Sequence, residues 1–235
     1  MTRHTPVLLD EIISYLDLQP GQNVVDCTFG GGGHTRAFLK KVAPSGKVLA
    51  LDADQRVEAI DKDFELSENL VFVHSNFRHL KEVVQNNFPY PIHGVLIDLG
   101  LSSDQLEISG RGFSFKNNEP LDMRFDIDQD LTAADILNTY SADELQQIFQ
   151  DYGEYRASKT LATAIVKTRK DKKFITTEDL VNLVLDVHPI KKKHFKIHPA
   201  TQVFQALRIE VNGELESLRL VLPQILDVLS PGGRA

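Results

Sequence analysis

The stretch Asn23 to Thr35, NVVDCTFGGGGHT, decides the fold. Its first five residues are mostly apolar and β-branched, which predicts a short buried strand ending near Asp26. Four consecutive glycines then indicate a tight turn, and a helix is predicted from His34 to Val42. A strand, a glycine-rich turn and a helix in this order are typical of the first unit of a doubly wound parallel sheet.

The sequence that follows repeats this alternation. Apolar runs predict strands at Lys47–Asp52 (KVLALD), Leu70–His74 (LVFVH) and Gly94–Leu99 (GVLIDL). Helix-like stretches lie between them, one to about Phe64 and one at Leu80–Phe88. Strands and helices that alternate at this spacing predict an α/β fold with a Rossmann-like doubly wound sheet.

After Gly100 the pattern changes to helices without strands. Residues 110–120 are rich in Gly and Asn and are expected to be loop, whereas residues 132–186 have helical spacing. The segments LTAADIL, SADELQQIF and TTEDLVNLVL each start with Thr or Ser followed by acids, as helices do. We therefore expect a helical subdomain at 104–200, inserted into a domain made of residues 1–103 and 201–235.

The last residues predict a helix and then a turn. Glu214–Leu229 has helical spacing with Pro223 as a kink or a boundary, and Ser230–Gly233 (SPGG) is typical of a turn. On this interpretation the sheet holds only four strands, and the strand at 94–99 has a bare edge. Such an edge promotes association, so we expect a weakly stable, poorly active chain and a possible homodimer.

Charge is distributed unevenly along the chain. The net charge is −7, yet residues 156–208 hold twelve Lys or Arg and four Asp or Glu, a local charge of +8 that leaves −15 elsewhere. A basic block on an acidic body indicates a site for a polyanion, and a solvated helical face is the alternative. The single cysteine and the lack of a secretory signal or long apolar run favour the cytoplasm and no membrane.

The glycine turn has acids around it that indicate a particular cofactor. The dinucleotide pattern G-x-G-x-x-G is incomplete, because Thr35 or Arg36 stands at the third glycine position. Asp26 instead precedes Gly30 by four residues, a spacing typical of S-adenosylmethionine sites. Asp52, at the end of the second strand, is placed to accept both ribose hydroxyls, and Asp98 ends the fourth strand.

Two further residues near this edge have two interpretations each. His34 either contacts the cofactor or caps the helix that follows the turn. Phe77 follows the third strand, so it either stacks on the adenine or packs in the core.

Six motifs together resemble the ribosomal RNA small subunit methyltransferase H family, also called MraW, from about residue 4 to residue 235. The resemblance implies a Rossmann-like enzyme with a helical insertion, which uses S-adenosylmethionine to methylate the exocyclic amine of a cytidine at the decoding centre of the small subunit. The motifs are HTPVLLDE (4–11), FGGGGHT (29–35), DLGLSSDQL (98–106), RGFSF (111–115), PLDMR (120–124) and HPATQVFQALRIEVNGEL (198–215).

Carried over residue by residue, the resemblance implies a set of cofactor contacts and leaves the catalytic group open. The family usually has Pro where this chain has Asp104, and it continues beyond Arg234 with further strands. Asp98 is the candidate catalytic acid, although Leu99-Gly100 replaces the Pro-Pro of many amino-methyltransferases, and it holds the cofactor's amine in the alternative. The implied cofactor contacts are Gly32, Gly33, His34, Asp52, Phe77, Asp98 and Gln105.

The basic block supplies the candidate RNA contacts. Lys191, Lys192 and Lys193 are predicted to bind RNA, within an insertion that recognises it. No metal is expected, because these cations lie beside His188, His194 and His198 and would repel a metal ion. Competing hypotheses are an inactive nucleotide- or RNA-binding module, a methyltransferase of a small molecule or protein, and a dinucleotide oxidoreductase.

Overall fold

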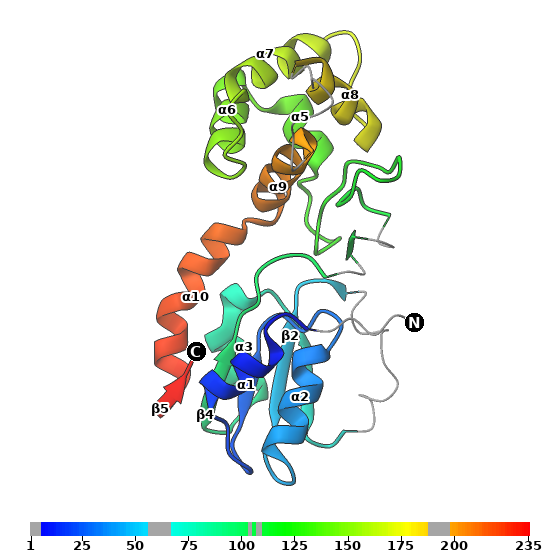
Figure 1. Ribbon diagram of the computed structural model, residues 1–235. Helices are drawn as coiled ribbons and strands as arrows, with labels where there is room; N and C mark the ends of the chain where they lie inside the picture. The colour runs from blue at the N-terminus through cyan, green and yellow to red at the C-terminus, as the bar shows by residue number, and fades with distance from the viewer. Residues whose placement is uncertain (1–5, 56–66, 103–104, 107–109, 188–197) are drawn as a thin grey trace. The chain divides into compact units, whose positions relative to one another are not determined.

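A computed structural model describes residues 6–55, 67–102, 105–106, 110–187 and 198–235 (Figure 1). The chain forms two compact units. Unit 1 comprises Met1–Ser103 and Leu215–Ala235, and unit 2 comprises Asp104–Glu214. The sequence placed residues 201–214 with the first domain, whereas they pack within unit 2.

Unit 1 is built on a parallel five-stranded sheet in the order β3-β2-β1-β4-β5. Its register places Val25 beside Leu49 on one side and beside Val95 on the other. The α/β fold class predicted from the sequence is therefore confirmed. The strands are β1 (Val24–Asp26), β2 (Val48–Asp52), β3 (Leu70–His74), β4 (Ile92–Leu96) and β5 (Leu229–Arg234).

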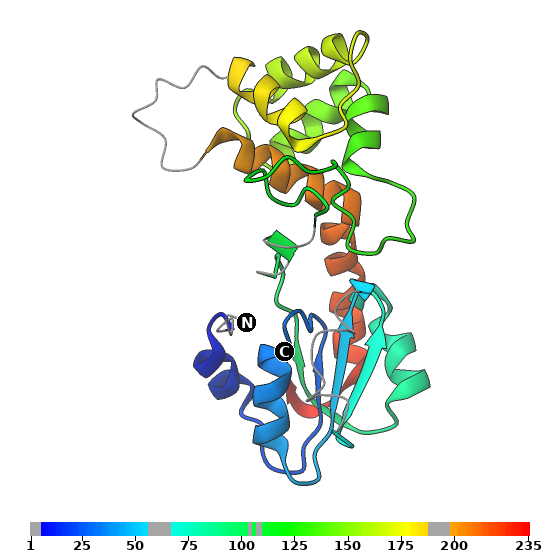
Figure 2. The same ribbon diagram turned by 90° about the vertical axis from the view of Figure 1, so that its right-hand side faces the viewer.

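Helices cover both faces of this sheet, as Figure 2 shows for α1 and α2 on one side and α3 on the other. Neighbouring strand residues point to opposite faces. Val24 accordingly packs with Phe38 of α2, while Val25 packs with Val83 of α3 and Ile225 of α10. The helices are α1 (Leu9–Leu16), α2 (Gly33–Val42), the 3-10 turn η2 (Phe77–His79), α3 (Leu80–Asn87) and α10 (Glu214–Val228).

The end of the chain corrects three expectations. Leu229–Arg234 forms β5 beside β4, so the expected SPGG turn, the four-stranded sheet and the bare edge of the fourth strand are wrong. Proline is tolerated here because β5 is an edge strand, where one side needs no ladder hydrogen bonds. The pairing shifts register between Ile92 and Gly94, in keeping with an irregular strand.

Two boundaries also differ from the sequence prediction. Pro223 lies inside α10 and does not end it, so it is no boundary. The fourth strand runs from Ile92 to Leu96, two residues earlier at its start than predicted, and Asp98 therefore follows the strand by two residues. This shift places Asp98 in the segment that leaves the sheet.

Unit 2 is helical, with two helices that begin at complete capping boxes. Thr132 and Ser141 each accept a hydrogen bond from the backbone N–H three residues later, and the acid there accepts one in return. Leu145, Leu161 and Leu207, each on a different helix of the unit, are fully buried in its core. The helices are α5 (Ala133–Thr139), α6 (Ala142–Asp151), α7 (Ser158–Thr168), α8 (Thr177–Val187) and α9 (Pro199–Asn212).

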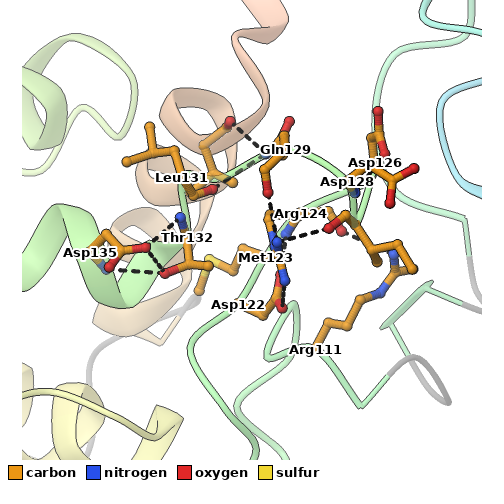
Figure 3. Close-up of polar contacts among 12 residues, drawn as sticks. Arg111, Asp122, Met123, Arg124, Asp126, Asp128, Gln129, Leu131, Thr132 and Asp135 are labelled. Carbon is orange, nitrogen blue, oxygen red and sulfur yellow. Dashed lines mark hydrogen bonds and ion pairs between the residues drawn. The ribbon is translucent and has the colours of Figure 1, made fainter.

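The PLDMR motif folds the loop before α5 around one arginine (Figure 3). Arg124 binds both carboxylate oxygens of Asp122 at 2.8 Å and donates to the carbonyls of Ile127 and Gln129 at 2.9 and 2.6 Å. Arg111 donates in turn to the carbonyl of Arg124 at 3.0 Å. The Arg124 side chain is committed to the loop itself, so this motif has a structural role.

Arg124→Ala is expected to destabilise unit 2 by about 2–3 kcal/mol, because two loop carbonyls and a half-buried carboxylate lose their donors. Urea unfolding followed by circular dichroism measures this. Lys172→Ala is the matched control, since the Lys172–Asp179 ion pair has an exposed lysine. The exposed pair should contribute far less. Equal losses in the two variants would contradict a special role for Arg124.

No helix within the described ranges is long and apolar enough to cross a membrane.

Candidate functional site

The strand order places a switch point between β1 and β4. From β1 the chain adds β2 and β3 on one side, and β4 and β5 on the other. In open parallel sheets, ligands bind outside the carboxyl ends of the strands at such a point. The residues that follow β1, β2 and β4 therefore form the candidate site.

The glycine turn after β1 adopts backbone shapes that only glycine adopts readily. Gly30 and Gly32 have φ of 51° and 70°, and Gly32 is the N-cap of α2. A Cβ on Gly33 would lie 2.3 Å from Cγ of Pro6, whereas a Cβ on Gly31 would meet nothing within 4 Å. The turn is thus packed against the chain at Gly33 and open at Gly31, which lets a ligand approach the backbone.

Asp52 ends β2 and is held by the turn. Its two carboxylate oxygens accept the backbone N–H of Gly30 at 2.8 Å and of Asp54 at 2.9 Å. Burial raises the pKa of the Asp52 carboxyl to about 6, although these two N–H donors lower it. Each oxygen keeps a free lone pair, so the carboxylate can still accept two hydroxyl donors.

Asp26 ends β1 and is enclosed by the glycine turn. Its side chain is fully buried and accepts the Thr35 hydroxyl at 2.7 Å and the Thr28 N–H at 3.2 Å. Burial raises the pKa of Asp26, and the nearby charge of Asp98 raises it further. Asp26 therefore shapes the turn from inside through its bonds to Thr28 and Thr35.

Asp98 is exposed, just beyond the end of β4. Its backbone N–H donates to the Thr28 hydroxyl at 2.8 Å, which ties the exit of β4 to the exit of β1. The structure thus brings Asp26, Asp52 and Asp98 to one edge of unit 1. The edge is acidic and suits a cationic ligand.

The structure places the other candidate residues as follows. His34 lies in the first turn of α2, where its Nε2 donates to the carbonyl of Val7 at 3.2 Å and makes no cap bond. Phe77 begins η2 and packs partly buried against the core. Gln105 belongs to unit 2. The lysines at 191–193 and the histidines at 188 and 194 lie outside the described residues.

Sequence reasoning missed the two threonines that organise the turn. Thr28 and Thr35 bind Asp98 and Asp26 through their hydroxyls. The available signal was that Thr28 stands two residues after Asp26, the acid that ends the strand. This signal is weak, because threonine is found in turns for many other reasons. In the described part of the chain, no group of three or more His, Cys, Asp or Glu side chains could hold a metal ion.

A family model described as the MraW methylase family matches residues 1–235. The chain belongs to the MraW methylase family. The resemblance stated from the sequence motifs is thereby confirmed. Methyl transfer is the class of reaction that this family is named for, and the acidic edge of unit 1 is its candidate site here.

Named relatives agree with this membership. "Ribosomal RNA small subunit methyltransferase H" of Thermomicrobium roseum is 47% identical over 237 residues, which cover 99% of this chain and 72% of the relative. The protein of the same name from Dictyoglomus thermophilum is 44% identical and covers 98% and 77%. Among solved structures, a putative rRNA-methylase from Clostridium thermocellum is 23% identical with a TM-score of 0.34, and covers 44% of this chain and 56% of that one.

Proposed function

We propose that this MraW family protein transfers a methyl group from S-adenosylmethionine to small-subunit ribosomal RNA, at the exocyclic amine of a cytidine. The observation that carries the proposal is the family match over residues 1–235, together with the acidic edge around the glycine turn. The relatives named for this reaction support it. An inactive nucleotide- or RNA-binding module is the alternative.

The residues of unit 1 fit this cofactor. The free lone pairs of Asp52 suit the two ribose hydroxyls, and Asp98 is an exposed carboxylate for a charged ammonium group. The open backbone at Gly31 and the αL turn at Gly32 allow close approach of the ligand. Gly33, His34 and Phe77 complete the proposed contacts within unit 1, with Phe77 stacking on the adenine.

The chain's own groups must position a weak nucleophile. S-adenosylmethionine supplies an electrophilic methyl group on a sulfonium, and a cytidine amine has its lone pair delocalised into the ring. Alignment of the two reactants is worth up to about 7–11 kcal/mol in favourable cases. Asp98 is proposed as the acceptor of an amine proton, since a carboxylate there stabilises positive charge as it develops on nitrogen. Holding the cofactor's amine is the second role open to it.

Cofactor affinity is expected to fall at acid pH. Hydroxyl donors favour the ionised form of Asp52, whose pKa is about 6, so binding must expel a proton below that pH. Affinity should be constant above pH 7 and about tenfold lower at pH 5. Calorimetric titration with S-adenosylhomocysteine measures this, and Asp52→Asn should abolish the pH dependence. A flat profile between pH 5 and pH 7.5 in the parent chain would contradict the ribose assignment.

An exposed surface on unit 2 is proposed to contact the RNA backbone. Lys159, Thr163 and Lys167 are exposed at four-residue spacing on α7 and so share one face, with Arg156 before the helix and Lys170 after it. We call the four cations of this set the α7 surface. None of them is in an ion pair with a described residue, and residues 156–170 contain no acid.

The α7 surface complements the proposal for Lys191, Lys192 and Lys193. Phosphates bind unpaired, exposed cations because each contact releases condensed counterions. Arg169 does not belong to the surface, although it lies in the same segment, since its guanidinium donates to the carbonyls of Leu137 and Tyr140 at 2.9 and 2.6 Å. In unit 2 the RNA contact is therefore assigned to the α7 surface, whose cations form no ion pair with a described residue.

The direct test of the function uses small ribosomal subunits from cells that lack the enzyme. Incubation with methyl-labelled S-adenosylmethionine should label the ribosomal RNA, and nucleoside analysis should identify a cytidine methylated at its exocyclic amine. Label on another nucleoside would overturn the cytidine assignment. Cofactor or RNA binding without label transfer would favour the inactive module.

A further inference from the structure

We propose that Thr28 is a positioning residue for methyl transfer, which holds Asp98 through the Asp98 backbone N–H. This inference rests on the proposed function, because it concerns the same site. Thr28 contacts no reacting group in this assignment. It acts by fixing the segment that carries the Asp98 carboxylate.

Thr28 follows β1 at the point where the pairing of β1 with β4 ends. The backbone ladder between β1 and β4 continues one residue past β1, where the Cys27 N–H donates to the carbonyl of Leu96 at 2.9 Å. The two chains then diverge, and no backbone bond joins them further along in the described residues. The Thr28 hydroxyl takes over by accepting the Asp98 N–H at 2.8 Å. One side chain thus extends the pairing across the switch point.

The exposure of the segment around Asp98 makes this hydrogen bond important for holding the segment in place. Residues 98–100 are exposed, and Gly100 has a φ of 147° with open space around it. Among the described residues, the bond to Thr28 is the hydrogen bond that Asp98 makes. A segment that makes so few hydrogen bonds with the described residues is expected to populate several conformations when this bond is removed.

Thr28 itself is held firmly on the other side. Its backbone N–H donates to the buried Asp26 at 3.2 Å, and the following Phe29 N–H donates to the carbonyl of Leu51 at 2.9 Å. The anchor for Asp98 is therefore part of the turn that is proposed to bind the cofactor. The same turn would then place both the methyl donor and the group that faces the target amine.

Thr28→Val keeps the side-chain shape and removes the acceptor. We expect hydrogen exchange of the Asp98 amide, measured by NMR, to become about tenfold faster or more. We also expect kcat/KM for methyl transfer to fall about tenfold, since small misplacements of a positioned group are costly. Thr28→Ser restores the acceptor and should return both values to within about threefold of the parent.

Two controls separate positioning from general damage. Thr35→Val removes the other hydroxyl of the turn and should leave exchange at Asp98 slow, because Thr35 binds Asp26. In a double-mutant cycle, Thr28→Val should have no further effect on kcat/KM in an Asp98→Ala background. Additive losses would show that Thr28 acts elsewhere and would overturn the proposal.

The exchange measurement distinguishes this inference from the proposed function. If the parent chain methylates no ribosomal RNA, the proposed function fails. If Asp98 exchange is unchanged in Thr28→Val, the positioning role fails even when the parent chain is active. Fast exchange with unchanged kcat/KM would also overturn it, since the freed segment would then be irrelevant to methyl transfer.

Discussion

Asp52→Ala is expected to lower the affinity for S-adenosylmethionine by on the order of 100-fold. Loss of the proposed ribose hydrogen bonds to this charged carboxylate should cost up to about 3 kcal/mol in all, which corresponds to a loss of affinity on the order of 100-fold. The substitution also frees the Gly30 N–H, which Asp52 accepts at 2.8 Å. The glycine turn then loses one of its fixed points as well as its ligand contacts.

Isothermal titration calorimetry with S-adenosylhomocysteine measures this loss. Asp52→Asn retains the shape and one acceptor oxygen, so its affinity should lie between those of the parent and the alanine variant. Glu82→Gln removes one charge from an exposed position of the same unit and is the control for net charge. Unchanged affinity in Asp52→Ala would remove Asp52 from the cofactor site.

Neutralising the α7 surface with Arg156→Gln, Lys159→Gln, Lys167→Gln and Lys170→Gln is expected to weaken RNA binding by on the order of 1000-fold at about 0.1 M salt. Each lost phosphate contact removes about 0.8 from the slope of log affinity against log salt. The combined variant should therefore have a slope shallower by about three. Fluorescence anisotropy with a labelled fragment of small-subunit RNA, repeated at several salt concentrations, gives both values.

The matched control keeps every charge. Lys159→Arg, Lys167→Arg and Lys170→Arg together should leave the salt slope unchanged, because the slope counts neutralised phosphates and not the kind of cation. Circular dichroism of both variants tests whether α7 still forms. An unchanged slope in the neutralised variant would mean that the α7 surface is only a solvated face.

The sequence predicted those elements whose pattern and neighbours agree. Leu70–His74 was predicted as a strand with the bounds that it has in the structure, and α5 and α6 begin at the expected caps, Thr132 and Ser141. In both cases the local sequence is sufficient. A run of apolar and β-branched residues favours a strand, and a Thr or Ser hydroxyl accepts hydrogen bonds from the free backbone N–H groups at the start of a helix. The family resemblance could also be stated from the sequence, because each of its motifs is a continuous stretch of residues.

Elements that depend on tertiary partners could not be predicted in this way. Residues 230–233 were predicted as a turn because Pro and Gly dominate them, yet pairing with β4 makes them part of the strand Leu229–Arg234. The spacing of Asp26 indicated a cofactor, but it gave no sign of the hydrogen bond from the Thr35 hydroxyl nine positions later. The Thr28–Asp98 bond spans 70 positions, and no local pattern reports such a distance.

The order of strands has a consequence for the timing of synthesis. β4 ends at Leu96 and its neighbour β5 begins at Leu229, with the whole of Asp104–Glu214 made in between. At about 5–20 residues synthesised per second, β5 begins to be made roughly 7–27 s after β4 is complete. During that interval a hydrophobic strand edge is exposed on the nascent chain. Early folding of the inserted unit would shorten the loop that β5 must close and so limit the entropy cost of completing the sheet.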